Sequence, residues 1–144
     1  MRVLLAVDGS KCSLQGVKNL IAHARWYRTK PHVELVNVRP LLPYERRVSH
    51  VLGAEEVRRY YRQEGEKALA GAKKLLDAAS INYRTHISIG PAADTIAKAA
   101  KDLRCDLIMM GTHGRTLAGQ VVLGSVALKV LQTAGVPVQL VRVA

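Results

Sequence analysis

The sequence has few aromatic residues and few cysteines. It holds one tryptophan, five tyrosines and no phenylalanine, and these rings are not interleaved with basic residues as they are in RNA-binding modules. The two cysteines, Cys12 and Cys105, lie far apart and form neither a CxxC motif nor a zinc-binding pattern. From the spacing of the cysteines we expect two reduced thiols. From the scarcity and placement of the aromatic residues we expect nucleic acid not to be the partner.

Segments for a membrane or for export are also missing. No apolar stretch approaches the roughly 20 residues that a membrane span needs. The apolar part of the first residues, MRVLLAVDGS, is too short for a signal peptide, and it ends at an acidic residue without a small-residue cleavage pattern. We expect a cytoplasmic protein with no membrane partner.

Acidic residues are scarce relative to basic ones. The chain has 11 Asp and Glu residues against 22 Lys and Arg residues, which gives a formal net charge of +11. This balance favours an anionic partner such as a nucleotide, a nucleic acid or an acidic surface. With 144 residues, of which 49% are hydrophobic, the chain is long enough for one domain over residues 1–144 with a substantial core.

Short apolar runs alternate with helical stripes along the chain. The runs predict strands at 3–7, 33–38, 81–89, 106–110 and 137–143. The stripes predict a helix after Ser10 with apolar positions from Leu14 to Ala24, a helix over 54–79, a helix opened by Gly90-Pro91 with Pro91 at its first position, and a helix over 125–134. Pro40, Pro43 and Gly53 predict a loop over 39–53. Such alternation predicts an α/β fold, a three-layer sandwich in which a five-stranded parallel sheet carries helices on both faces. Right-handed crossovers leave few topologies, and we expect the strand order 3-2-1-4-5.

A ligand is expected where the strand order reverses, beyond the carboxyl ends of the first and fourth strands. The first strand ends in Asp8-Gly9-Ser10, and the fourth ends in Met110-Gly111. The ends of these two strands therefore predict one site, provided that the strand order is right.

The stretch from 111 to 126, GTHGRTLAGQVVLGSV, is rich in glycine and follows the fourth strand. A Gly-Ser step at a helix start presents free N–H groups, which favours phosphate, and Ser125 can donate a further hydrogen bond. Gly114 and Gly124 lack a Cβ, so the backbone can approach phosphate oxygens closely. The segment is not a P-loop, because Ser125 stands where the lysine should be. The chain also lacks the dinucleotide-binding motif, because no GxGxxG follows the first strand. Spacing alone leaves open a flexible loop with a helix cap.

With its flanks, this spacing resembles a known family. Gly111-x2-Gly114-x9-Gly124-Ser125, together with LLAVDGS, LVNVRP, CDLIMMGTHGR and LGSVALKVL, resembles the ATP-binding branch of the universal stress protein family. The resemblance covers nearly the whole chain. It implies a five-stranded parallel α/β fold, usually a dimer, that binds ATP and acts in survival under stress, commonly without a settled enzymatic activity.

The resemblance also implies nucleotide contacts. Asp8 would accept a hydrogen bond near the adenine or ribose, and Val38 would lie by the adenine. The ribose and phosphates would be wrapped by Gly111, His113, Gly114 and Arg115. The phosphates at the helix start would be held by Gly124, Ser125 and Val126. The candidate set is completed, at the ends of the two strands, by Gly9, Ser10 and Met110.

The function expected is that of a nucleotide-dependent sensor or switch that binds ATP, or else AMP or ADP, with or without Mg²⁺. We assign no catalytic residue and no metal ligand, and we expect at most slow ATP hydrolysis, because the loop holds no dedicated carboxylate base. Asp8 could instead serve only as a turn former. His113 is expected to contact sugar or phosphate or simply to face solvent, and Arg115 could equally be a solvated loop charge. The alternative function is a basic nucleic-acid or protein-interaction module that does not use ATP.

The last predicted strand, PVQLVRV, should lie at the edge of the sheet. It has no charged residue before Arg142, and an exposed edge of this kind invites another chain. We therefore expect a homodimer in which this strand pairs with its copy.

Overall fold

The five strands form one sheet in which every neighbouring pair is parallel, in the order β3-β2-β1-β4-β5. The computed structural model describes residues 1–43, 50–51, 53–113 and 123–142. The strands are β1 (Arg2–Ala6), β2 (His32–Arg39), β3 (Tyr83–Ile89), β4 (Leu107–Gly111) and β5 (Val138–Val141). The helices are α1 (Lys11–Ala22), the 3-10 turn η1 (Ala24–Trp26), α3 (Ala54–Ala78), α4 (Ala92–Asp102) and α5 (Ser125–Thr133). The predicted fold class and strand order are confirmed.

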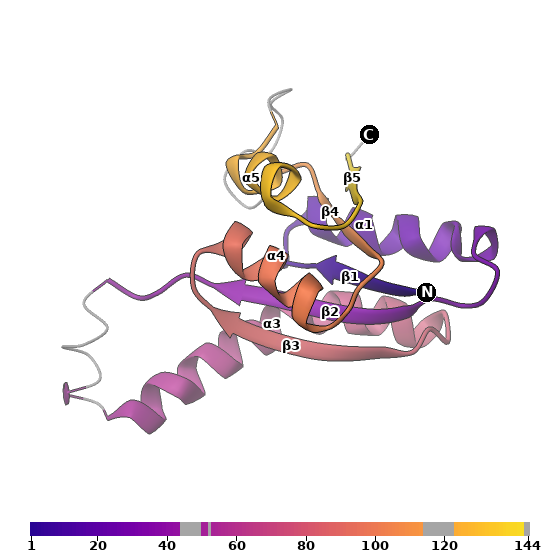
Figure 1. Ribbon diagram of the computed structural model, residues 1–144. Helices are drawn as coiled ribbons and strands as arrows, with labels where there is room; N and C mark the ends of the chain where they lie inside the picture. The colour runs from indigo at the N-terminus through magenta and orange to yellow at the C-terminus, as the bar shows by residue number, and fades with distance from the viewer. Residues whose placement is uncertain (44–49, 52, 114–122, 143–144) are drawn as a thin grey trace.

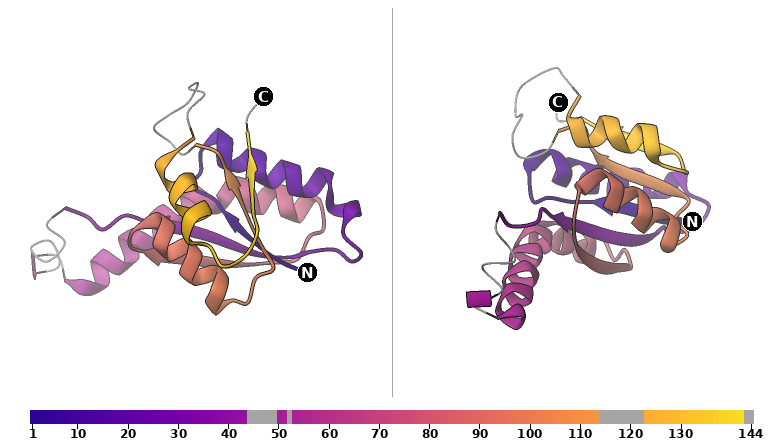
Figure 2. Two further views of the ribbon diagram at one scale, coloured as in Figure 1. Left: turned by 45° about the horizontal axis from the view of Figure 1, so that its top comes forward. Right: turned by 60° about the vertical axis from the view of Figure 1, so that its left-hand side comes forward.

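The helices cover both faces of the sheet, which makes three layers (Figures 1 and 2). α1 and α3 pack on one face, and α4 and α5 pack on the other. Because side chains alternate along a strand, β1 supplies both interfaces. Val3 and Leu5 point towards α1 and α3, whereas Leu4 and Ala6 point towards α4 and α5.

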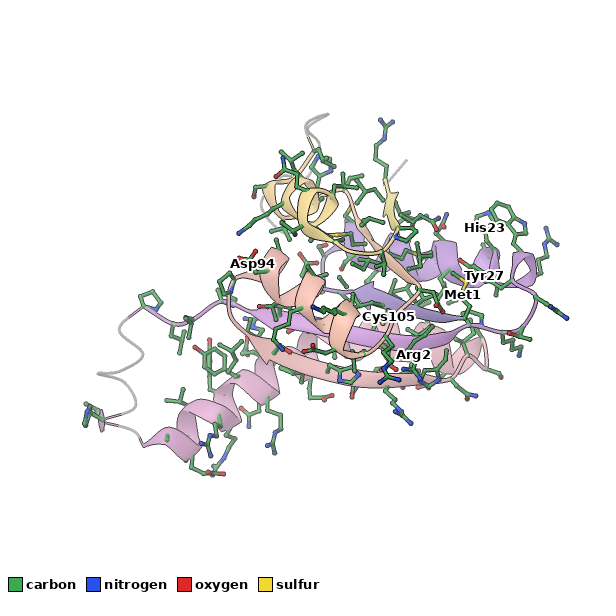
Figure 3. The ribbon with its side chains drawn as sticks, viewed as in Figure 1. Met1, Arg2, His23, Tyr27, Asp94 and Cys105 are labelled. Atoms are coloured by element: carbon green, nitrogen blue, oxygen red, sulfur yellow. The ribbon has the colours of Figure 1, made fainter. Side chains whose placement is uncertain are left out.

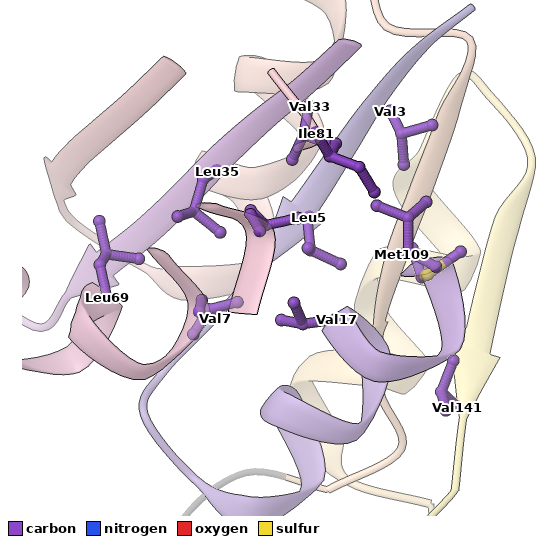
Figure 4. Close-up of a cluster of buried hydrophobic side chains, with 13 residues drawn as sticks. Val3, Leu5, Val7, Val17, Val33, Leu35, Leu69, Ile81, Met109 and Val141 are labelled. Carbon is purple, nitrogen blue, oxygen red and sulfur yellow. The ribbon is translucent and has the colours of Figure 1, made fainter. Parts of the chain in front are cut away.

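The core on the side of α1 and α3 is built from aliphatic side chains with little or no exposure (Figure 4). Val17 of α1 and Leu69 of α3 are fully buried in the same cluster as Val33 and Leu35 of β2. Burying each such side chain contributes about 1.5–3 kcal/mol. This core fixes the positions of the strand ends, and with them the place where a ligand can bind.

Local hydrogen bonds explain where several elements begin and end. The Ser10 hydroxyl accepts a hydrogen bond from Ser13 N at 3.1 Å and caps α1 as predicted. The predicted first helical stripe runs on to Ala24, but α1 ends at Ala22 because the backbone of His23, its C-cap, leaves the helical conformation with a φ of −106° and a ψ of 11°. The ring of His23 turns back over the helix end, where its Nδ1 lies 2.9 Å from Asn19 O.

Two other predicted boundaries differ from the structure. The strand predicted at 81–89 begins at Tyr83, because Ile81 N bonds to Leu76 O at 3.0 Å and completes the end of α3. Pro91, expected at the first helical position, is the N-cap of α4. Part of the predicted loop 39–53 and the end of the predicted last strand lie outside the described residues.

Candidate functional site

A cavity of about 160 Å³ lies at the carboxyl ends of β2, β1 and β4, between the sheet and the first turns of α4 and α5. This is the point where the strand order reverses, and so it is the place that the fold makes available for a ligand. The cavity is lined by Ala6, Val7, Asp8, Ser13, Val36, Val38, Ala92, Ile96, Met110, Gly111, Thr112, His113, Gly124, Ser125, Val126 and Ala127.

The floor of the cavity is apolar. Ala6 of β1 lies in register with Val36 on one side and with Met110 on the other, so the three side chains form one row across the sheet. Val38 lies two residues beyond Val36 and continues the same face. Ile96 of α4 adds an aliphatic wall. Such a surface suits a flat, weakly polar group.

Asp8 has two roles in the structure. It lines the cavity, and its Oδ1 accepts a hydrogen bond from Ser10 N at 2.9 Å, which closes the turn between β1 and α1. Its own N–H donates to Ser13 Oγ at 3.3 Å. Oδ2 makes no hydrogen bond with the described residues. The turn-forming role considered from the sequence is therefore present, and it leaves one carboxylate oxygen for a ligand.

The start of α5 forms the polar side of the cavity. Gly124 is the N-cap of α5, and no side chain of a described residue caps this helix. Leu128 N is the first amide to bond back to Gly124 O, at 2.9 Å. The preceding amides, on Ser125, Val126 and Ala127, belong to residues that line the cavity. Free N–H groups and the helix dipole make this end attractive to an anion.

Gly111 and Gly124 are required by close packing within the chain itself. A Cβ on Gly111 would lie 2.8 Å from Cys12 Sγ and 2.9 Å from the Cys12 carbonyl carbon. A Cβ on Gly124 would lie 3.0 Å from Thr112 O, the atom that accepts the Gly124 N–H at 2.9 Å. These two glycines thus let the end of β4 approach α1 on one side and α5 on the other.

Thr112 connects the elements around this end of the sheet. Its N–H donates to Val141 O of β5 at 3.0 Å, and its carbonyl oxygen accepts from Gly124 N. Its hydroxyl lies 2.9 Å from His113 Nδ1. Both Thr112 and His113 line the cavity, so the backbone bonds of Thr112 hold the rim that carries His113.

The structure brings together most of the residues predicted for the site. Those that line the cavity are Asp8, Val38, Met110, Gly111, His113, Gly124, Ser125 and Val126. Gly114 and Arg115 lie outside the described residues. Gly9 and Ser10 do not line the cavity. Ser10 caps α1, and Gly9 has a φ of 82° and packs where a Cβ would lie 3.2 Å from Ala68 Cα of α3.

Sequence reasoning missed other lining residues, namely Ala6, Val7, Ser13, Val36, Ala92, Ile96, Thr112 and Ala127. The alternation of side chains along β1 and β2 could have found Ala6 and Val36, since they lie two residues before Asp8 and Val38. Nothing in the sequence marked Ala92 or Ile96, because their place depends on how α4 packs over the sheet.

A separate ionisable cluster lies near the amino ends of the strands, away from the cavity. The Glu34 carboxylate, 1% exposed, lies 2.7 Å from His86 Nε2, 3.4 Å from His32 Nε2 and 3.5 Å from Arg2 Nε. Burial raises the pKa of the nearby Cys105 thiol to about 11, with the Glu34 charge adding to the rise (Figure 3). Among the described residues, no group of three or more His, Cys, Asp or Glu side chains is arranged to hold a metal ion.

The parallel sheet with helices on both faces defines a doubly wound α/β protein, and its cavity lies at the switch point of the strand order. The family model of the universal stress proteins matches residues 1–142. Universal stress protein MJ0531 of Methanocaldococcus jannaschii is 30% identical over 142 residues, which cover 98% of this chain and 81% of that protein. The chain belongs to the universal stress protein family.

Solved structures share this architecture. The structure of MJ0577, a universal stress protein of the same organism, has a TM-score of 0.79 and 25% identity, and the match covers 99% of this chain and 96% of that chain. A family member from Arabidopsis thaliana, solved with AMP bound, has a TM-score of 0.71 and 15% identity over 100% of this chain and 92% of its own. At that identity the likeness shows the fold alone. Within the described residues, no helix has the length and apolar character needed to cross a bilayer.

Proposed function

We propose that this protein binds an adenine nucleotide, ATP in the first place, in the cavity at the switch point. The observation that carries the proposal is the pairing, in one pocket, of an apolar floor with a helix start that no described side chain caps. A base needs a flat apolar surface, and phosphates need N–H donors and positive charge. The AMP bound to the Arabidopsis relative supports adenine as the base.

The apolar floor of the pocket suits the adenine, and the start of α5 suits the phosphates. Val38 and its neighbours on the floor would lie against the adenine, and Asp8 Oδ2 would accept a hydrogen bond from the base or ribose. The first N–H groups of α5 and the Ser125 hydroxyl would hold phosphate oxygens. His113, Gly114 and Arg115 would complete the contacts from the segment after β4, and Mg²⁺ would arrive on the phosphates of ATP.

The role that follows is that of a nucleotide-dependent sensor or switch in the stress response, acting as a single domain in the cytoplasm. The two buried cysteines, which form no disulfide, suit a reducing compartment. Hydrolysis would be slow at most, because Asp8, the carboxylate of the cavity, has one oxygen committed to the turn at Ser10. The alternative function is a nucleic-acid or protein-interaction module that does not bind ATP, and the binding experiment below tests it.

Calorimetric titration of ATP and AMP tests the proposal. We expect both to bind the wild type, and we expect Val38→Phe to reduce ATP affinity at least tenfold, because the ring would fill the floor of the cavity. Ile89→Phe is the matched control, since Ile89 is 42% exposed at the end of β3 and does not line the cavity. Phosphate release should stay far below the roughly 10 per second typical of enzymes. Absence of ATP and AMP binding to the wild type, or equal affinity in the two variants, would overturn the proposal.

A homodimer is the second part of the proposal. β5 is an edge strand of four residues without a charged side chain. Pro137 O and Val141 O accept hydrogen bonds from Ile108 N and Thr112 N, so the backbone groups of Leu140 point away from the sheet. We expect sedimentation at micromolar concentration to give the mass of a dimer, and Leu140→Pro, which removes an outward N–H, to give a monomer. A single-chain mass for the wild type at every concentration would contradict this.

A further inference from the structure

The end of α1 carries an exposed tryptophan that neither the core nor the cavity uses. Trp26 closes the 3-10 turn η1 and is 72% exposed. Tyr27, next to it, packs against the core cluster, and its burial raises the pKa of its hydroxyl. The Tyr27 ring therefore packs against the protein core, whereas the Trp26 ring projects into solvent. Most of the indole surface is therefore open to contact with a partner.

The outward position of Trp26 is structurally fixed. The centroid of the His23 ring lies 3.9 Å from that of the indole, with the planes tilted by 48°. His23 is itself held at the end of α1, because its Nδ1 lies 2.9 Å from Asn19 O. One side of the indole is therefore occupied by a ring that is anchored to the helix, and the rest of it projects from the surface.

The surface around Trp26 is positive. Residues 9–33 contain no Asp or Glu, and the side chains of Arg25 and Arg28, which flank the tryptophan, are exposed. Neither arginine forms an ion pair with any described residue. Lys30, also exposed, donates to Ser80 O at 3.4 Å. The tip that these residues form, residues 23–30, combines one projecting indole with two guanidinium groups that pair with no carboxylate of the described residues.

We propose that this tip binds the surface of a bilayer that contains anionic lipids. Tryptophan favours the headgroup region, where its ring meets apolar chains and its N–H meets water. Arginine pairs with lipid phosphates in a bidentate way, and clusters of basic residues are attracted to anionic leaflets. A nucleic acid fits less well, since His23 covers part of the indole and the neighbouring Tyr27 is packed into the core. The expectation of no membrane partner rested on the lack of a span, which contact of this kind does not need.

The tip lies away from the nucleotide pocket. α1 runs back from the carboxyl ends of the strands, so its last turn lies near their amino ends. Figure 3 shows His23 and Tyr27 at the right-hand end of the molecule and Asp94, in the first turn of α4 beside the cavity, well to the left of them. A protein held to a bilayer through Trp26 would keep its pocket open to solvent.

Fluorescence tests this directly, because Trp26 is the only tryptophan in the chain. We expect vesicles of phosphatidylglycerol and phosphatidylcholine to shift its emission to shorter wavelength and to protect it from acrylamide, and pure phosphatidylcholine vesicles to do neither. In vesicle sedimentation, Trp26→Ala and the double variant Arg25→Gln/Arg28→Gln should each bind about tenfold more weakly. Circular dichroism confirms that the variants remain folded.

A control variant distinguishes vesicle binding by residues 23–30 from vesicle binding by the net positive charge of the whole protein. Arg58→Gln/Arg59→Gln removes the same charge from exposed arginines of α3 that pair with Glu55 and Glu56, and it should bind vesicles nearly as well as the wild type. Equal weakening in the two double variants would overturn the proposal, as would vesicle binding without an emission shift. An emission shift with single-stranded oligonucleotide or polyglutamate, but not with anionic vesicles, would assign the tip to another partner and overturn it too.

Discussion

Ser125→Ala is expected to lower the affinity for ATP by about one to two decades while leaving the affinity for adenosine nearly unchanged. The hydroxyl belongs to the first residue of α5, where it can donate to a phosphate oxygen. A hydrogen bond to a charged group is worth about 1.5–3 kcal/mol. Adenosine has no phosphate, so under the proposal it would not contact this end of the cavity. Calorimetry with the two ligands gives both numbers.

A matched control for the Ser125 experiment lies at the other end of the same helix. Thr133→Ala removes a hydroxyl that donates to Lys129 O within α5 at 2.8 Å, far from the cavity. We expect this variant to bind ATP like the wild type. If Ser125→Ala weakens adenosine as much as ATP, or weakens neither, the phosphates do not lie at the start of α5.

Gly111→Ala is expected to reduce the free energy of unfolding by about 1–3 kcal/mol, the usual cost of overpacking. The new methyl group would lie 2.9 Å from the carbonyl carbon of Cys12 and 3.0 Å from its oxygen. The Cys12 sulfur can rotate away, but its backbone can move only if the first turn of α1 moves as well. Urea unfolding measures the loss, and any loss of ATP affinity should follow from the displaced strand end.

The glycine at 135 provides the comparison for Gly111. A Cβ there would meet nothing within 4 Å, so Gly135→Ala should change the stability by no more than about 0.5 kcal/mol, or raise it slightly. If the two alanine variants unfold at the same urea concentration, then Gly111 is not held by α1, and its place in the sequence has to be explained by the ligand.

The sheet was predictable because alternation and crossover handedness are properties of the chain order. The exact ends of the helices and strands were less predictable than the sheet. The end of α1 depends on His23 turning back to Asn19, and the start of β3 depends on Ile81 closing α3, and both are choices between competing local hydrogen bonds. Such choices differ by little in free energy, and periodicity does not resolve them.

The site was predictable where it follows the strand ends. Asp8 and Met110 were expected there, and they line the cavity. Ile96 was not expected, because a helix that comes later in the chain brings it there. The sequence also could not say what each glycine is for. Gly111 stands in a motif that resembles nucleotide binding, yet its nearest neighbours in the fold are atoms of Cys12.

The central place of β1 has a consequence for how the molecule assembles. β1 contains the first residues of the chain, but one of its two edges is completed only by β4, where Val3 meets Leu107. The middle of the sheet therefore depends on closing a loop that spans most of the chain, and long-range parallel pairing of this kind is slow to form. Until β4 arrives, the open edge of β1 is an apolar strand that can pair with a neighbouring chain. The strand that anchors the finished fold is thus the one most exposed to misassembly while the chain is folding.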